Sequence, residues 1–283
     1  VFKLLDGAVH RFSCQCRQVA FPAGSVRSTR HVTEIDQVRQ RKGGLGTAIV
    51  QGGGNDRQKG GDTNYSNFSN NRLTIVTGAI NAGADISTLT IGQKPFSNPG
   101  ASILVSAPGS NVVSTSLMIE NAELSVFGND YDTVQGTSFA TPIISGIVAL
   151  MLEANPNLGY RDVQEILALT AKKVNDPTAA WTDNHATNWN GGAMHVSHDY
   201  GFGEVDARAA VRLAETWLQR NTLANEHSLA SPPSSGTLNL AIPDNNPTGM
   251  SNSLTVNADI LVEHAEVTIN LTHAHAGDLD RKS

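Results

Sequence analysis

An almost unbroken run of small and apolar residues in the middle of the chain limits the folds that are open to it. The segment "YDTVQGTSFATPIISGIVALML" covers residues 131–152, and its part from Ile143 to Leu152 leaves almost no polar side. A helix of this composition is expected to be buried all round. The run is about half as long as a membrane span, so we predict a core helix and no transmembrane segment. Pro142 suits the first turn of this helix, where its missing N–H is not required.

Short β-rich runs precede this helix, and amphipathic helices follow it. The β-rich runs cover residues 47–50, 72–80 and 103–109, and the helical patterns cover 160–174 and 206–218. In the last helix we expect five residues to face inward, namely Val211, Leu213, Ala214, Trp217 and Leu218. Strands mixed with helices in this way indicate an α/β domain with a largely parallel sheet.

The overall composition is that of a compact globular protein. Of the 283 residues, 39% are hydrophobic and 16% are charged, which argues against extended disorder. The net charge of −6 gives no general attraction to nucleic acid or to an anionic membrane surface, so we predict neither as a partner. Cys14 and Cys16 are separated by one residue, a spacing that does not predict a mutual disulfide.

The two ends of the chain differ from its middle. Residues 1–42 are basic, with 8 lysines and arginines against 3 acidic residues, and they show no sustained period, so we assign them no element. A polar linker rich in serine and proline covers 221–236. Within 237–283, apolar residues alternate along the stretch from Val262 to Leu271, which indicates the start of an all-β module.

Ser138 is the first candidate for chemistry. It lies between Gly136 and Pro142, where the simplest alternative is a helix cap by Ser138 or Thr141. A hydroxyl at the positive end of a helix dipole also lies where a developing negative charge is stabilised. The backbone N–H of Ser138 would supply half of an oxyanion hole, and Gly136 removes a side chain from the approach to Ser138.

Asn55, at the end of "IVQGGGN", is the second candidate. Most Gly-Gly-Asn sequences are turns, so a turn asparagine is the alternative. As a functional residue, Asn55 would direct its amide donor at the same oxyanion. A strand that ends in three glycines lets a substrate backbone lie close against it, so we name Gly53, Gly54 and Gly136 as candidate substrate-binding residues.

Taken together, these stretches resemble the subtilisin-like serine proteases (peptidase S8). "GTSFATP" is similar to the nucleophile signature of that family, and "GGGN" to the segment with its oxyanion asparagine. "NPNLGYRDVQEIL" and "HVSHDYGFGEVDARAAVRLAETW" resemble the last helices of the catalytic domain in the kexin and proprotein-convertase branch. "IPDNNPTG" (242–249) and "THAHAGDL" (272–279) resemble the opening of the P domain, or Homo B domain, of that branch. The resemblance covers roughly residues 43–279.

The resemblance implies both a domain organisation and an activity. It implies the C-terminal part of a subtilisin-like α/β domain at 43–220, a linker at 221–236, and the N-terminal part of a jelly-roll P domain at 237–283. We therefore expect a chain truncated at both ends, and one hypothesis for the unassigned residues 1–42 is an aberrant reading frame. The implied activity is that of a serine endopeptidase with a polypeptide substrate, in which Ser138 is the nucleophile and Asn55 holds the oxyanion.

The same resemblance implies a structural calcium ion, with Asp62 as a candidate ligand, a propeptide in the full-length protein, and secretion or display at the cell surface. An acidic position of the convertase specificity pocket falls at the neutral Ser66. We name Ser66 as a candidate substrate-binding residue and do not predict cleavage after paired basic residues.

The triad of that family departs from its pattern here. Its aspartate and histidine precede the oxyanion asparagine along the chain, yet none of the histidines and aspartates found there has the family's local motif: Asp6, His10, His31 and Asp36. The resemblance therefore predicts that the chain as written is inactive. We expect roles in packing, at the surface or in the linker for the downstream histidines: His195, His198, His227, His273 and His275. For His273 and His275, which share one face of a strand, a metal-binding pair is the alternative to exposed strand residues.

Hypotheses of three classes remain open at this point. The first is a serine endopeptidase in the parent protein, which the retention of Ser138 and Asn55 favours. The second is a non-catalytic secreted binding or structural protein that retains the protease scaffold, which the missing triad partners favour for this chain. The third is a carbohydrate-binding or cell-surface module built on the P domain, which the short length of that part disfavours.

Overall fold

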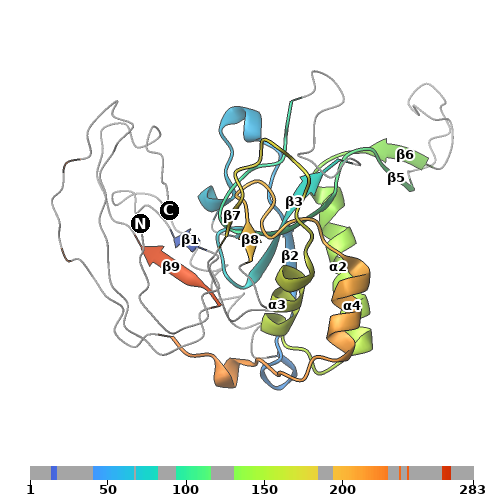
Figure 1. Cartoon of the computed structure of the whole chain (residues 1–283), viewed down its shortest axis with the longest axis vertical. Helices are drawn as coiled ribbons and strands as arrows, with labels where there is room; N and C mark the ends of the chain where they lie inside the picture. The colour runs from blue at the N-terminus through green and yellow to red at the C-terminus, as the bar shows by residue number, and fades with distance from the viewer. Residues whose placement is uncertain are drawn as a thin grey trace.

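A parallel three-stranded sheet forms the centre of the protein, with its strands in the order β2-β3-β4 (Figure 1). These strands are β2 (Ile49–Gly52), β3 (Thr74–Ile80) and β4 (Ile103–Pro108). The computed structural model describes residues 14–17, 41–66, 68–81, 94–115, 131–183, 194–228, 236, 241 and 263–268.

The three predicted strands are confirmed, with bounds shifted by up to two residues. Every residue of β3 is buried, as are the first five residues of β4, whereas β2 at the edge is only half-buried. Strands of a parallel sheet that are covered on both faces read as nearly continuous apolar runs, which is how "TIVTGAI" and "ILVSAP" read. The register between β3 and β4 shifts once, between Val76 and Thr77.

Helix α2 (Thr137–Ala154) crosses all three strands, and it begins earlier than the sequence predicted. Pro142 therefore lies in the second turn of the helix and not in the first. Because proline has no N–H, the carbonyl of Ser138 lacks the donor that residue 142 would otherwise supply.

The prediction that this helix is buried all round is wrong. The inner side of α2 is in the core, whereas the outer side is exposed, with Leu150 at 51% exposure. The exposed residues recur at helical spacing along that side: Ser138, Pro142, Ser145, Gly146, Ala149, Leu150 and Glu153. Composition indicates that a helix can be buried, but the neighbours that the fold supplies decide which sides are covered.

By length and composition, α2 would also suit a membrane. Among the described residues it is the one helix that is long and apolar enough to cross a bilayer, with 18 residues and a mean hydropathy of 1.5. Its inner side packs against the sheet through Ile144, Ile147 and Met151, as the core helix of an α/β domain does.

Two further helices complete this layer. Helix α3 (Tyr160–Thr170) ends four residues before its predicted end and packs against β4. Helix α4 (Ala207–Glu215) packs against α2 and α3. Leu218 lies beyond the end of α4 and is 98% exposed, so the prediction that it faces inward is wrong.

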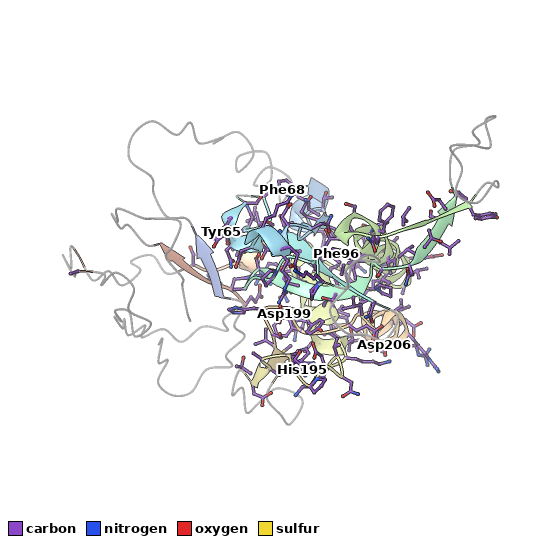
Figure 2. All side chains as sticks on the ribbon, turned by 90° about the horizontal axis from the view of Figure 1, so that it is seen from above. Tyr65, Phe68, Phe96, His195, Asp199 and Asp206 are labelled. Atoms are coloured by element: carbon purple, nitrogen blue, oxygen red, sulfur yellow. The ribbon has the colours of Figure 1, made fainter. Side chains whose placement is uncertain are left out.

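One apolar cluster joins the sheet to the three helices. It includes Ile75 and Val105 from the sheet, Ile144 from α2 and Ile166 from α3, together with Phe96, which lies in the middle of the body (Figure 2). Full burial of side chains of this size contributes about 1.5–3 kcal/mol each. The cluster therefore fixes α2 against the sheet and with it the position of Ser138.

Several short elements were not predicted. Antiparallel pairs are formed by β5 (Val112–Thr115) with β6 (Tyr131–Val134), and by β7 (Thr182–Asp183) with β8 (His195–Val196). The single-turn helices are η1 (Arg41–Gly44), η2 (Arg57–Lys59), η3 (Thr63–Tyr65) and η4 (Leu223–Asn225).

The described parts of the two ends pair with each other. Strand β1 (Cys14–Arg17) is parallel to β9 (Ala265–Thr268). β1 lies within residues 1–42, for which the sequence predicted no element, whereas β9 falls inside the alternating run 262–271. The other residues of the expected P domain lie almost wholly outside the described part, so the jelly roll stays a prediction.

Candidate active site

Ser138 is the second residue of α2 and is exposed. The N–H groups in the first turn of a helix have no carbonyl of the preceding turn to bond, and among the described residues nothing accepts the N–H of Ser138. Gly136 precedes the helix with a φ of 143°, in the region that favours glycine. A methyl group on Gly136 would meet only ordinary contacts, so the backbone rather than a lack of space requires glycine here.

The side chain of Asn55 is bonded to the first residue of the same helix. Its Oδ1 accepts hydrogen bonds from the Thr137 N–H at 2.9 Å and from Thr137 Oγ1 at 3.1 Å. A backbone N–H can only donate, so the amide oxygen must face Thr137 and the Nδ2 group must face away. In the part of the chain that the structure describes, no group accepts from this Nδ2. The structure thus brings Asn55 and Ser138 to the same end of α2, and their shared role at an oxyanion stays a prediction.

Thr137 is a residue of this site to which the sequence analysis gave no role. It is 2% exposed, and its hydroxyl donates to Asn55 Oδ1 while accepting the N–H of Gly54 at 3.1 Å. One hydroxyl therefore joins the start of α2 to the loop after β2. The only sequence signal for this role is the position of Thr137 beside Ser138 in "GTS".

The N–H groups of Gly53 and Gly54 are already used within the chain. Gly53 donates to the carbonyl of Thr77 at 2.9 Å, and Gly54 donates to Thr137. Both glycines hold the loop that carries Asn55, and their binding of a substrate backbone stays a prediction.

Asp62 and Ser66, the candidates for a calcium ligand and for the specificity pocket, follow Asn55 along the chain. Asp62 is half-buried, and its Oδ1 accepts the N–H of Asn64 at 2.7 Å, which caps η3. Ser66 is exposed and ends η3. Across the described ranges, no group of three or more His, Cys, Asp or Glu side chains could hold a metal ion. The role of Asp62 as a calcium ligand therefore stays a prediction, and no step below uses the ion.

No hydrogen bond joins Ser138 to a histidine in the part of the chain that the structure describes. His195 in β8 is half-buried and packs edge-on against Trp181, with ring centres 5.3 Å apart, and burial lowers the pKa of its imidazole. Figure 2 shows His195 on the opposite side of the molecule from Tyr65 and Phe68, which belong to the loop after Asn55. His198 and His227 are exposed. The others that the sequence singled out lie outside the described residues: His10, His31, His273 and His275.

Comparison with known families agrees with this geometry. Residues 21–203 match the subtilase family (peptidase S8). The chain belongs to the subtilase family. The match begins at residue 21, inside the stretch 1–42 that the sequence analysis left unassigned.

The curated relatives of this subtilase include proprotein convertases. Proprotein convertase subtilisin/kexin type 7 of Homo sapiens is 30% identical over 251 residues, which are 84% of this chain and 29% of the relative. Protease KEX1 of Kluyveromyces lactis is 30% identical over 190 residues, which are 66% of this chain and 22% of the relative. The chain thus spans less than a third of the length of these relatives. The resemblance to the kexin and proprotein-convertase branch is confirmed.

A solved structure supports the fold. The serine protease of Aeromonas sobria superposes with a TM-score of 0.55 at 24% identity, covering 77% of this chain and 42% of that one. At this identity the likeness shows the fold, which is the subtilisin-like α/β arrangement of a parallel sheet and helices predicted from the sequence.

Proposed function

We propose that this chain carries the nucleophile and the oxyanion hole of a serine endopeptidase. Ser138 Oγ attacks the carbonyl carbon of a peptide bond, and the oxygen that becomes negative is held by the Ser138 N–H and by Asn55 Nδ2. The pair of hydrogen bonds from Thr137 to Asn55 Oδ1 carries this proposal. These bonds hold the oxygen of the Asn55 amide against Thr137 and so turn its Nδ2 donor away from Thr137, which directly precedes the exposed Ser138.

The proposed reaction has two halves. As the bond from Ser138 Oγ to carbon forms, the hydroxyl proton passes to a base, and the base returns it to the leaving amine as the C–N bond breaks. Water then attacks the acyl-serine in the same way and restores Ser138. The missing triad motifs predicted that the chain as written is inactive; this proposal departs from that expectation and takes the base and its orienting acid from outside the described residues. The exposed outer side of α2 leaves Ser138 open to them.

The partners follow from the family. A polypeptide substrate, a propeptide in the full-length protein, a structural calcium ion, and secretion or display at the cell surface stay inferences from the resemblance. The serine protease (ASP) of Aeromonas sobria has been solved in complex with a chaperone (ORF2), which supports recognition of such a domain by a second protein.

The test is covalent labelling of the folded chain with a fluorophosphonate probe, which modifies activated serines. We expect labelling of the wild-type chain and none of Ser138→Ala. Ser145→Ala is the matched control, because Ser145 is an exposed serine on the same helix and should leave labelling unchanged. Equal labelling of Ser138→Ala, or no labelling of a folded wild-type sample, would contradict the proposal. The second of these results would favour the non-catalytic scaffold.

A further inference from the structure

A second asparagine lies behind the loop that carries Asn55, and the proposed chemistry does not use it. Asn98 belongs to the segment before β4 and is only 8% exposed. We propose that Asn98 is a positioning residue that holds the backbone on both sides of Asn55, so that the amide of Asn55 is fixed where an oxyanion forms. This inference rests on the proposed function and adds a residue to its machinery.

Three hydrogen bonds from Asn98 carry the inference. Its side-chain Oδ1 accepts the N–H of Asp56 at 2.7 Å, and its Nδ2 donates to the carbonyl of Gly53 at 3.1 Å. Its backbone N–H donates to the carbonyl of Gly54 at 2.9 Å. A single buried residue therefore bonds both residues before Asn55 and the one after it.

The glycines of this loop make room for the Asn98 amide. Gly54 has a φ of 101°, in the region that favours glycine, and a methyl group on it would overlap Asn98 Nδ2. A methyl group on Gly61 would lie 2.6 Å from Asn98 Oδ1. Close packing on this one side chain therefore accounts for the glycines at 54 and 61.

Asn98 is itself held firmly. Next to it, Ser97 Oγ accepts the N–H of Ala79 in β3 at 3.0 Å, which ties the segment to the central sheet. On its other side, the carbonyl of Pro99 accepts the N–H of Thr63 at 2.9 Å. The segment that carries Asn98 is thus hydrogen-bonded to the buried sheet as well as to the loop that carries Asn55.

Asn55 is consequently fixed from two directions. Thr137 holds its side-chain oxygen, and Asn98 holds the backbone from which that side chain projects. Oxyanion donors act because they are in place before charge develops, and a misplacement of about 1 Å costs on the order of 100-fold in rate. Removing the Asn98 amide should therefore weaken catalysis through Asn55 and not through a contact with the substrate.

The test compares three variants. Asn98→Ala removes both side-chain bonds, whereas Asn98→Asp keeps the acceptor for the Asp56 N–H and loses the donor to Gly53. Asn70→Ala is the matched control, because Asn70 is also 8% exposed and its amide donates to a backbone carbonyl outside this loop, that of Asn64 at 3.1 Å.

The first measurement is amide hydrogen exchange, which needs no activity. In Asn98→Ala we expect the Asp56 N–H to exchange at least about tenfold faster than in the wild type, with β4 unchanged. Asn98→Asp should keep most of the protection of that N–H, and Asn70→Ala should keep all of it. Unchanged exchange at residues 53–56 in Asn98→Ala, or an equal increase throughout β4, would overturn the inference.

The second measurement is the rate of fluorophosphonate labelling. We expect Asn98→Ala to label Ser138 on the order of 10- to 100-fold more slowly. Because Asn98 acts through Asn55, the double variant with Asn55→Ala should be no slower than Asn55→Ala alone, and additive losses would overturn the positioning role. If wild-type Ser138 does not label, the proposed function fails, and the exchange at Asp56 still decides whether Asn98 holds the loop.

Discussion

Helices α2 and α3 both pack against α4, yet the groups at their starts are bonded in different ways. At the start of α3, Asp162 is fully buried and its Oδ2 accepts the N–H of Gly159 at 2.8 Å. The same carboxylate also accepts from Trp217 Nε1 at 3.0 Å and from the N–H of Asn221. Every donor directed at this carboxylate is therefore satisfied inside the protein, as expected of a helix start with a purely structural role.

At the start of α2 the protein satisfies one donor and leaves the next one open. The Thr137 N–H is bonded to Asn55, whereas the N–H of the exposed Ser138 has no acceptor among the described residues. A helix start that leaves a donor open to solvent can bind an anionic oxygen. The first turn of α2 therefore divides its donors between two roles: the Thr137 N–H holds the site together, and the Ser138 N–H is left for a ligand.

The largest expected effect is on the labelling rate of Ser138 when Asn55 is replaced. Replacing it by aspartate keeps an acceptor for Thr137 but removes the amide donor. We expect fluorophosphonate labelling of Ser138 to slow about 10²- to 10³-fold, the usual consequence of losing one oxyanion donor. Gln51→Glu, a comparable exchange on half-buried β2, is the control and should label at nearly the wild-type rate. Labelling of Asn55→Asp at the wild-type rate would show that the amide donor of Asn55 has no part in the reaction at Ser138.

At the start of α3 the expected effect is on stability alone. Asp162→Ala leaves the N–H groups of Gly159, Trp217 and Asn221 without their acceptor, and a loss of about 3 kcal/mol in the free energy of unfolding is expected. Denaturant unfolding measures this loss. Labelling of Ser138 should stay at the wild-type rate while the variant is folded.

The control for that variant is Glu215→Ala, which removes an exposed carboxylate paired with Arg212 at 3.1 Å. An exposed pair of this kind contributes about 0–1 kcal/mol, so this variant should be nearly as stable as the wild type. If Asp162→Ala lost no more stability than Glu215→Ala, the structural role of this helix start would be refuted.

The sequence predicted the framework of this comparison better than its details. Apolar runs located β3, β4 and helix α2, because strands and helices that are buried must be apolar. Local motifs also singled out Ser138 and Asn55. The role of Thr137 could not be predicted, since it depends on contact with Asn55, 82 residues away in the chain.

Other misses have physical reasons of the same kind. The four-residue strands β5 and β6 are too short to show a period, and their pairing depends on the fold around them. Leu218 fits the apolar pattern of α4, but the helix ends at Glu215 and places it in solvent. The outer side of α2 looked buried because composition cannot show which neighbours are present.

An effect of intermediate size is expected from pH on the stability of the fold, through a histidine that contacts α3. His264 Nε2 lies 3.0 Å from Gln164 Oε1 on α3, and burial lowers the pKa of its imidazole to about 4. The charged groups around it are two arginines and two glutamates: Arg72, Arg161, Glu226 and Glu263. The pKa of a histidine in an unfolded chain is about 6.5, so between these values the unfolded state binds more protons. Stability should therefore be fully present above about pH 6.5 and fall as the pH drops toward 4.

The measurement is thermal unfolding of the wild type and of His264→Gln at pH 7.5 and pH 5. At pH 5, protonation of the unfolded state should cost the wild type about 2 kcal/mol that the variant does not lose, since about 1.4 kcal/mol corresponds to each pH unit. Equal losses in the two proteins would show that His264 does not titrate in this way.

The smallest effect is expected from Thr137→Val, which keeps the N–H bond to Asn55 and removes the hydroxyl between Asn55 and Gly54. We expect a loss of about 1 kcal/mol in the free energy of unfolding and roughly tenfold slower labelling. Thr141→Val is the matched control, because its hydroxyl donates only to the carbonyl of Thr137 within the helix. If both variants labelled at the same rate, the hydroxyl of Thr137 would have no part in holding Asn55.

We expect two donors at the start of α2, the Ser138 N–H and the Asn55 side-chain amide, to bind an anionic oxygen, since neither has an acceptor among the described residues, whereas the donors gathered around Asp162 at the start of α3 are bonded within the protein. NMR titration of the isotope-labelled chain with a peptidyl boronic acid, which forms a tetrahedral anion on an active serine, tests it most directly. We predict large shifts of the Ser138 N–H and the Asn55 side-chain amide, with the Gly159 N–H unchanged. Shifts that are absent at Ser138 and Asn55, or equally large at Gly159, would contradict the account.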